Sequence, residues 1–392
     1  MGDMTMEALD ISSHGNEVRG SFESPDVIVE EIGSTLLAPL ARSDQRQKGM
    51  TYLRGLLGTR GRKSIRNIAA HVGGATAEQS LHHFISDSTW NWIPLRQALT
   101  RYLAQVAPPQ VWVVQPMVIP KAGEFSVGVD RQYFPALGQV LNAQQAIGVW
   151  AVAGNYCYPV NWRLHLSANW LADEDRRSRA LIPDGIQPET LGECTMHAFS
   201  GVVRELGVPA RPVVLESPEN DVATIRSFSH PTRVPLLVRI GSTFPLRLMD
   251  HGSPGGPGGI LPAHHIMGHV KDQRRPVIWR DQLMHGDGAP DLVASARVRL
   301  TGPLAARSQD LLLLGTGRRG RPWPGELWLT NMVQASPSEL AWLTCLRKRV
   351  DDAVTSVGDR VGVRDYAGRS YSGWHRHITM ASAAYAVAML AG

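Results

Sequence analysis

Cysteine is scarce in this chain of 392 residues, and its three cysteines stand far apart. Cys157, Cys194 and Cys345 form no CxxC pair, so neither a disulfide framework nor a structural zinc site is predicted. Histidines four residues apart in HHIMGH have a spacing that suits a metal, but no acidic partner is fixed near them. We therefore predict no metal site in this chain.

Long hydrophobic runs are missing as well. The apolar segment 378–391 is shorter than the roughly 20 residues that a bilayer span needs, so we predict a buried helix there. Residues 1–35 do not combine a basic start, an apolar run and a cleavage site, and we take them as a flexible leader. These absences predict a cytoplasmic protein that has no membrane partner.

Positive charge is present, but it is unevenly distributed. The formal net charge is only +5, yet residues 42–66 carry eight Lys or Arg against the single acid Asp44. Such a run forms either a solvated helix face or a set of contacts to phosphates, and charge alone does not choose between them. The run therefore marks the first place to look for a nucleic-acid contact.

Helical periodicity dominates residues 36–108. Within this range SIRNIAAHVG and TAEQSLHHFIS predict two helices joined by a glycine turn, with Thr76 as the N-cap of the second. Its exposed His82 and His83 would then face a DNA groove. An ordinary helical hairpin has the same pattern, but the adjoining basic run favours a helix-turn-helix-like DNA-binding domain.

The remaining chain predicts a mixed α/β fold. Residues 109–234 suggest three strands, a helix, a strand and a helix, the order of a ribonuclease-H-like core. Residues 235–335 contain five short apolar strands separated by Gly- and Pro-rich loops, which indicates a β-rich insertion. Residues 336–392 predict C-terminal helices that complete the core.

Four stretches resemble DDE transposases of bacterial insertion sequences, most closely the IS seven-hundred-and-one type. Together they span nearly all of the chain after residue 40, in the family's order. They are YLRGLLGTRGRKSIRNIA, PKAGEFSVGVDRQYFPALGQVLNAQQAIGVWAV, NWRLHLSANWLADEDRRSRALIP and SYSGWHRHITMASAAYAV.

The resemblance implies a site in which two Asp and one Glu hold divalent metal ions against DNA phosphates. In the segment where the family has its first Asp, this chain has Gln115 and Pro116. At the position of the family's second Asp this chain has Ser217, and Glu216 stands one residue earlier. Asp351, shorter by a methylene, replaces the Glu. Metal-dependent cleavage is therefore expected to be lost.

The residues around the third acid are changed as well. Arg347 and Arg349 keep the family's basic positions on that helix, but the companion Tyr and Lys correspond by spacing to Thr344 and Gly358. The pair that would position a phosphate is thus absent from the expected places.

The DNA contacts that we predict are basic or aromatic residues from the basic run, from the stretches that carry the resemblance and from the helix of the third acid. GWHRH, at 373–377, has two equal interpretations, contact with the DNA backbone or packing of the last helix. Three arginines of a predicted turn, Arg318, Arg319 and Arg321, form a second basic patch. The predicted contacts are Arg42, Arg46, Lys48, Arg54, Arg60, Arg62, Lys63, Arg66, Lys121, Arg131, Arg347, Arg349, Trp374, His375 and Arg376.

These features predict a transposase-like protein without catalysis, which binds double-stranded DNA as a sequence-recognising binder or regulator. It would need no cofactor and no small-molecule substrate, and a homodimer is left open. One alternative is an active transposase that gathers Glu216, Asp351 and Asp352 around Mg²⁺ or Mn²⁺. Another is an interaction protein that modulates an active relative.

Overall fold

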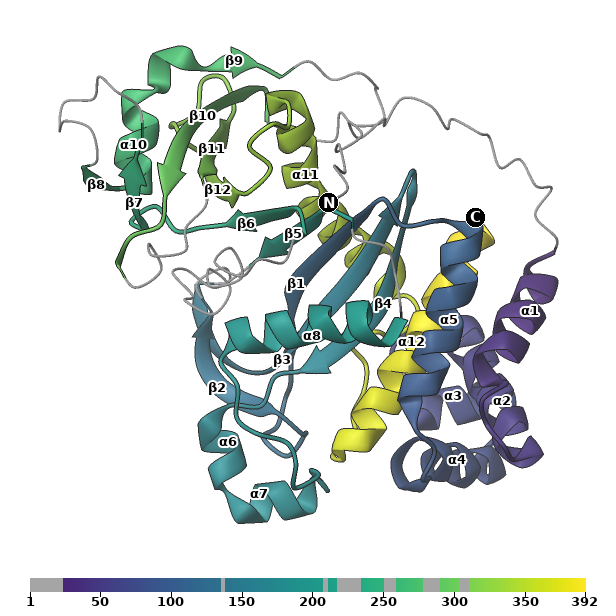
Figure 1. The fold of residues 1–392 in the computed structure, drawn as a ribbon. Coiled ribbons are helices and arrows are strands. Elements are labelled where there is room, and N and C mark those ends of the chain that lie inside the picture. Colours follow the sequence, from purple (N-terminus) through teal and green to yellow (C-terminus); the bar gives the residue numbers. More distant parts are fainter. Residues whose placement is uncertain are drawn as a thin grey trace, which may run out of the picture.

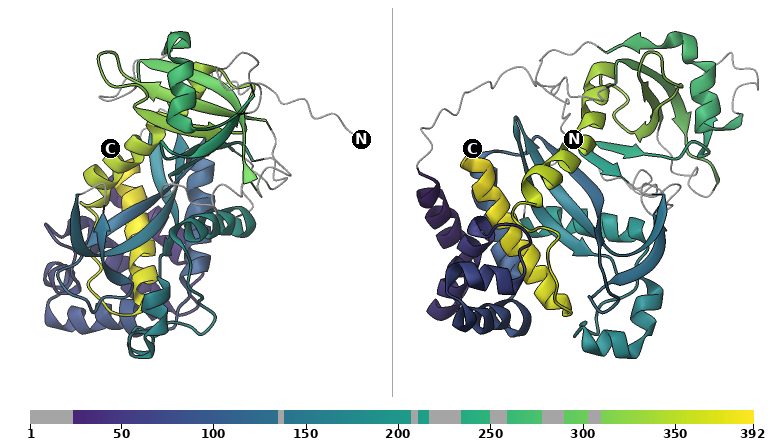
Figure 2. Two further views of the ribbon diagram at one scale, coloured as in Figure 1. Left: turned by 90° about the vertical axis from the view of Figure 1, so that its left-hand side faces the viewer. Right: turned by 180° about the vertical axis from the view of Figure 1, so that it is seen from behind.

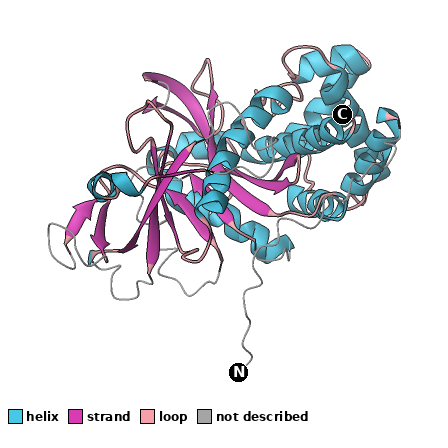
Figure 3. Ribbon diagram, turned by 90° about the horizontal axis from the view of Figure 1, so that it is seen from above, coloured by secondary structure: helices cyan, strands magenta, loops and turns pink. Residues whose placement is uncertain are grey.

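The computed structural model describes residues 24–134, 138–206, 211–216, 234–249, 259–277, 290–302 and 310–392. Helices begin and end the described chain, and the strands between them in the sequence form one large mixed sheet (Figure 1). Seen from above, the helices gather on one side of the molecule and most strands on the other (Figure 3). The predicted α/β fold class, with its N-terminal helices, is confirmed.

The N-terminal helices pack around apolar residues at helical spacing. They are α1 (Pro25–Leu37), α2 (Ser43–Gly58), α3 (Ile65–Val72), α4 (Ala75–His82), the π-helical turn η1 (His83–Asp87) and α5 (Trp92–Val106). The flexible leader predicted for residues 1–35 is wrong from Pro25 onward, because Ile28, Ile32 and Leu36 bury one face of α1. Thr76 is not an N-cap, since α4 begins at Ala75 after Gly74.

Five strands form the ribonuclease-H-like part of the sheet, in the order β4-β3-β1-β5-β6. β1, β5 and β6 run parallel, whereas β3 is antiparallel to β1 and β4 to β3. The strands are β1 (Val111–Pro120), β3 (Gln139–Ala153), β4 (Tyr156–Leu164), β5 (Val213–Glu216) and β6 (Leu236–Arg239), and the short β2 (Val129–Phe134) pairs with the start of β3. The sequence patterns did not predict β4 as a separate strand.

Strand β6, predicted to open the β-rich insertion, joins that insertion to the core. It pairs in parallel with β5 on one side and antiparallel with β12 on the other, so the sheet continues as β12-β11-β10-β7-β8. The elements of this part are β7 (Pro245–Leu248), β8 (Ile260–Pro262), α10 (Ala263–His269), η3 (Lys271–Gln273), β9 (Arg275–Pro276), β10 (Leu292–Arg299), β11 (Leu311–Gly317) and β12 (Glu326–Thr330). The helix predicted for 219–228 lies outside the described residues.

Helices cover both faces of the core sheet. In the view of Figure 1, α8 (Leu191–Leu206) crosses in front of the strands, and α11 (Pro337–Ala353) is seen from behind in Figure 2. Between β4 and α8 lie the short α6 (Ala168–Ala172) and α7 (Glu174–Arg179), and a π-helical turn, η6 (Val354–Gly358), follows α11. A capping box formed by Ser336 and Glu339 begins α11.

The helix α12 (Tyr371–Leu390) runs between the sheet and the N-terminal helices and is buried along almost its whole length. Trp162 of β4 donates a hydrogen bond to Ser382 Oγ at 2.9 Å, and Tyr385 packs edge-on against Trp150 of β3. The predicted buried helix is therefore a shared core element. None of the helices in the described ranges is long and apolar enough to cross a membrane.

Candidate functional site

Three elements bring the predicted acidic positions together. Gln115 lies in the middle of β1, Glu216 ends β5, and Asp351 lies near the end of α11. β1 and β5 are parallel, and Val114 is in register with Leu215, which places the two residues that follow them side by side. Ser217 lies outside the described residues.

An amide occupies the first position. Gln115 is buried, and its Nε2 donates a hydrogen bond to Asp351 Oδ1 at 2.8 Å, while its Oε1 has no hydrogen-bond partner among the described residues. Pro116, the next residue, points to the other face of the strand. The pairing of β1 with β5 ends at Val114, two residues before Pro116. The missing N–H of Pro116 therefore interrupts none of the described parallel pairing. Gln115 is thus the residue that faces the third acidic position.

Two arginines occupy the space between the carboxylates. Arg347 Nη1 lies 3.0 Å from Asp351 Oδ2 and 3.4 Å from Glu216 Oε2. Arg239 Nη1 approaches the other oxygen of Glu216 at 2.9 Å. Both arginines also lie within 4 Å of Glu326, at 3.6 Å from Arg239 and 3.9 Å from Arg347. We refer to these five residues, with Gln115, as the arginine-bridged cluster.

The cluster is electrostatically close to balance, with three carboxylates around two guanidinium groups. Partial burial raises the pKa of Asp351, and the neighbouring Glu216 raises it further, whereas Arg347 and the Gln115 hydrogen bond oppose the shift. The guanidinium groups therefore hold together acids that would otherwise repel one another.

This geometry does not fit the pair of metal ions that DDE enzymes use. A bridging site needs carboxylate oxygens directed at the metals, but Gln115 directs an N–H at Asp351 instead. Both oxygens of Glu216 are engaged by guanidinium groups. Asp352, the further acid of the alternative site, pairs with Lys348 at 3.3 Å. Among the described residues, no group of three His, Cys, Asp or Glu could hold a metal ion.

The companion positions on α11 do not restore the site. Thr344 is buried, and its hydroxyl donates to the Ala341 carbonyl of its own helix at 2.7 Å. Gly358 ends the π-helical turn η6 and is buried too. Arg349 is only partly exposed, whereas Arg347 belongs to the arginine-bridged cluster. His264, His265 and His269, considered above for a metal, lie in the helix α10.

The basic run of residues 42–66 divides into paired and unpaired side chains. Arg42 and Lys48 pair with Asp44, Arg54 pairs with Glu30, and Arg46 donates to two carbonyl groups in the connection between α1 and α2. Lys63 is buried, and its ammonium bonds the Thr59 carbonyl, so it is not available to phosphate. The exposed basic side chains of this run that make no ion pair and no hydrogen bond with a described residue are Arg60, Arg62 and Arg66.

Other predicted contacts differ in exposure. Lys121 donates to the Tyr366 carbonyl at 2.6 Å, and burial lowers the pKa of its ammonium to about 8, an effect to which Arg62 adds. Arg131 is exposed on β2. His82 and His83, as predicted, are exposed, and both approach Asp87. The second patch, Arg318, Arg319 and Arg321, is exposed between β11 and β12.

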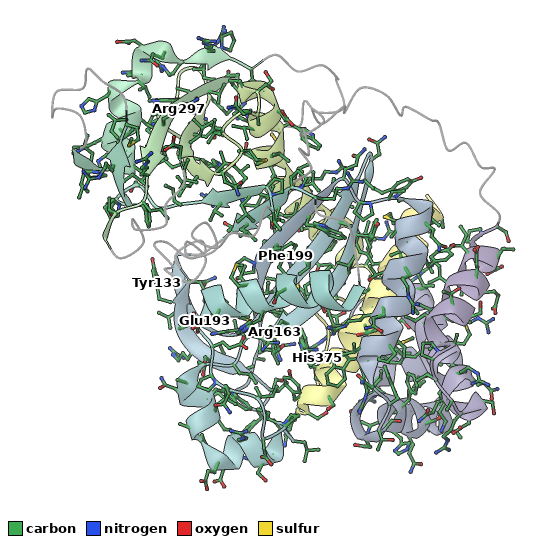
Figure 4. All side chains as sticks on the ribbon, viewed as in Figure 1. Tyr133, Arg163, Glu193, Phe199, Arg297 and His375 are labelled. Atoms are coloured by element: carbon green, nitrogen blue, oxygen red, sulfur yellow. The ribbon has the colours of Figure 1, made fainter. Side chains whose placement is uncertain are left out.

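The GWHRH segment lies inside the protein, which favours packing over DNA contact. Trp374, His375 and Arg376 are each at most 5% exposed. Arg376 donates to the carbonyls of Trp90 and Ile85, and His375 stacks on Trp92 with ring centroids 4.6 Å apart. Figure 4 shows His375 on α12 beneath the neighbouring helices. The burial of these three residues supports the packing interpretation of the segment.

Sequence reasoning missed Arg239 and Glu326, which complete the arginine-bridged cluster. Both come from strands, β6 and β12, that meet Arg347 only through the pairing of the insertion with the core. No spacing in the sequence signals that pairing.

Comparison with known proteins gives one family. A family model described as DDE superfamily endonuclease matches residues 35–283, which include helices α2 to α5 and the strands β1 and β5. Among curated proteins, no match was found. The matched range contains Gln115 and Glu216, and ends before α11.

Proposed function

Because the chain belongs to the DDE superfamily of endonucleases, whose substrate is DNA, we propose that it binds double-stranded DNA and does not cleave it. In this proposal it acts as a sequence-recognising binder or transcription regulator within the nucleoid. The observation that supports the loss of cleavage is the arginine-bridged cluster, where Gln115 faces Asp351 and guanidinium groups take up Glu216.

Chemistry explains why this replacement abolishes cleavage. Hydrolysis or transfer of a phosphodiester needs metal ions that generate the nucleophile and stabilise the charge of the transition state. Removing even one stabilising donor typically costs roughly 3–4 kcal/mol of transition-state energy. In this chain the amide of Gln115 cannot bridge metals, and Arg347 competes with any metal for Asp351.

Binding to DNA is supported by the exposed arginines between α2 and α3. Arg60 and Arg62 lie in the connecting loop, and Arg66 lies in the first turn of α3. Arginines held on a rigid helical unit give salt-dependent phosphate contacts, which orient the protein on the duplex. The exposed His82 and His83 would then reach the groove from α4 and η1.

The experiment that tests binding is retention of genomic DNA. Sheared DNA from the protein's own genome is incubated with the purified full chain at about 0.15 M salt, where phosphate contacts alone are weak. The retained fragments are sequenced. A few sharply enriched sites support a sequence-recognising binder. Uniform or absent retention contradicts that function and favours an interaction protein, the remaining alternative.

The experiment that tests cleavage uses supercoiled plasmid with Mg²⁺ or Mn²⁺. The wild type and Gln115→Asp are both expected to leave it intact, because Arg239 and Arg347 still engage the other carboxylates. Nicking by the wild type that disappears in Asp351→Asn would establish an active metal site and contradict the proposal. The mass of the DNA complex in solution tests whether two copies bind together.

A further inference from the structure

Three connecting segments meet on one side of the molecule. They are the α2–α3 loop (59–64), the β1–β2 connection (121–128) and the α11–α12 connection (359–370). The backbone N–H of Lys63 donates to Asp365 Oδ2 at 2.7 Å, and Lys121 donates to the carbonyl of Tyr366. Gly362, with φ +81°, approaches Lys63 so closely that an added Cβ would collide with its side chain. We call these segments the three-loop surface.

Positive charge dominates this surface. Besides the buried Lys63, the three segments carry six basic residues and only three acidic residues. Of the acids, Asp359 pairs with Arg364 at 3.2 Å, and Asp365 accepts the Lys63 hydrogen bond. The other acid is Glu124, and the six basic residues are Arg60, Arg62, Lys121, Arg360, Arg364 and Arg369.

An exposed aromatic ring lies within this basic surface. Phe125 is 66% exposed, more than any other aromatic side chain in the described ranges. The guanidinium carbon of Arg369 lies 5.3 Å from the centre of its ring. Leaving a phenylalanine in water forgoes roughly 1.5–3 kcal/mol of burial energy. An exposed Phe125 ring among arginines suits a ligand that carries both phosphates and flat rings.

We propose that the three-loop surface binds an unpaired DNA segment, a single strand or a single-stranded extension of a duplex, and that one base stacks on Phe125. The arginines contact its phosphates, and Arg369 holds the ring in place. Bases within a duplex are already stacked on both faces, so only unpaired bases can use this ring. This inference rests on the proposed function for DNA as the ligand, and it adds the form of DNA that is preferred.

The bound strand would lie away from the altered acidic site. Lys121 directly follows β1 and stands six residues after Gln115. At the rise of a β-strand, six residues place the two Cα atoms roughly 20 Å apart. The three-loop surface is thus a binding site separate from the arginine-bridged cluster.

The test compares three fluorescently labelled DNAs by anisotropy: a single strand, a blunt duplex and the same duplex with a single-stranded extension. We expect the extension to strengthen binding, and Phe125→Ala to weaken binding of the single strand and the extended duplex by roughly tenfold. Blunt-duplex binding should stay unchanged. Phe125→Trp should retain the preference, because tryptophan also stacks on bases.

The matched control is Tyr133→Ala. Tyr133 is 59% exposed and lies on β2, outside the three connecting segments (Figure 4). An equal loss in Phe125→Ala and Tyr133→Ala, or no preference for the extension, overturns the inference but leaves duplex binding intact. Binding of single strands without any duplex binding contradicts the proposed function and supports this inference.

Discussion

Gln115 donates its amide hydrogen to Asp351 at 2.8 Å, across the gap between a central strand and the helix that carries the third acidic position. The bond turns what would be two facing carboxylates into a neutral donor and a charged acceptor. Because Gln115 of β1 bonds Asp351, and Arg347 of the same helix as Asp351 pairs with Glu216 of β5, two side-chain contacts fasten the helix to the sheet. The stability of the protein should therefore depend on these contacts, which stand where the carboxylates of a metal site would repel one another if no cation lay between them.

Gln115→Glu, which keeps the side chain's shape but adds a charge, should lower the free energy of unfolding by about 1–3 kcal/mol at neutral pH. It replaces the donor of the 2.8 Å bond with a second carboxylate. One of the two facing carboxyls then has a raised folded-state pKa, so the lost stability should return as the pH falls through that value. Urea unfolding at several pH values measures this, and Gln115→Met is the uncharged control. Equal stability of the Gln115→Glu variant and the wild type at neutral pH would contradict a stabilising hydrogen bond from Gln115 to Asp351.

Arg347→Lys should also destabilise the fold, by about 2 kcal/mol. One ammonium group cannot reach Glu216, Asp351 and Glu326 together, as the planar guanidinium does. Thermal unfolding compares this variant with Arg349→Lys, which changes the same helix outside the arginine-bridged cluster. If both variants melt alike, the cluster does not contribute to stability.

Replacing Arg60, Arg62 and Arg66 by Ala together should weaken DNA binding and reduce its dependence on salt. Each lost phosphate contact lowers the slope of log K against log salt by roughly one. The same change at Arg318, Arg319 and Arg321, the second exposed patch, should leave the slope unaltered if only the first set touches DNA. A slope that falls only in the second variant would place the duplex on the insertion instead.

Arg376→Lys should destabilise the protein by about 3 kcal/mol without removing a DNA contact. The guanidinium of Arg376 donates to Trp90, Ile85 and Ser86 carbonyls and lies over the Trp90 ring, and an ammonium cannot reproduce this set. Chemical denaturation gives the stability, and DNA affinity is measured well below the melting temperature. A loss of affinity at unchanged stability would instead support the DNA-contact interpretation of GWHRH.

Mild acid should destabilise the chain through His377. Burial lowers the pKa of this imidazole to about 4, and its neutral form accepts from the Tyr52 hydroxyl while donating to the Gly362 carbonyl. In the unfolded chain the same imidazole has a pKa near 6.5, so it binds a proton at a higher pH than in the folded protein. The free energy of unfolding therefore falls as the pH drops from 6.5 to 4, by about 3 kcal/mol at most. Urea titrations across this range should show a shallower fall in His377→Gln. The control is the exposed His83→Gln, which should keep the wild-type slope.

The sequence indicated the fold class and the positions that face one another, but not what holds them. Gln115 and Asp351 could be picked out because the resemblance supplied their places on a strand and a helix. Arg239 could not, since its role depends on β6 pairing with both β5 and β12. A basic motif such as GWHRH suggests exposure from composition alone, yet Arg376 is buried because nearby carbonyls satisfy its donors.

The position of α12 has a consequence for synthesis. This helix packs against α1, α2 and α5, which leave the ribosome more than 260 residues before it does. Domains generally fold as they emerge, but here the N-terminal helices lack their central packing partner until almost the whole described chain has been made. Nascent chains and premature termination products should therefore lack the assembled basic surface, so only finished molecules would compete for DNA.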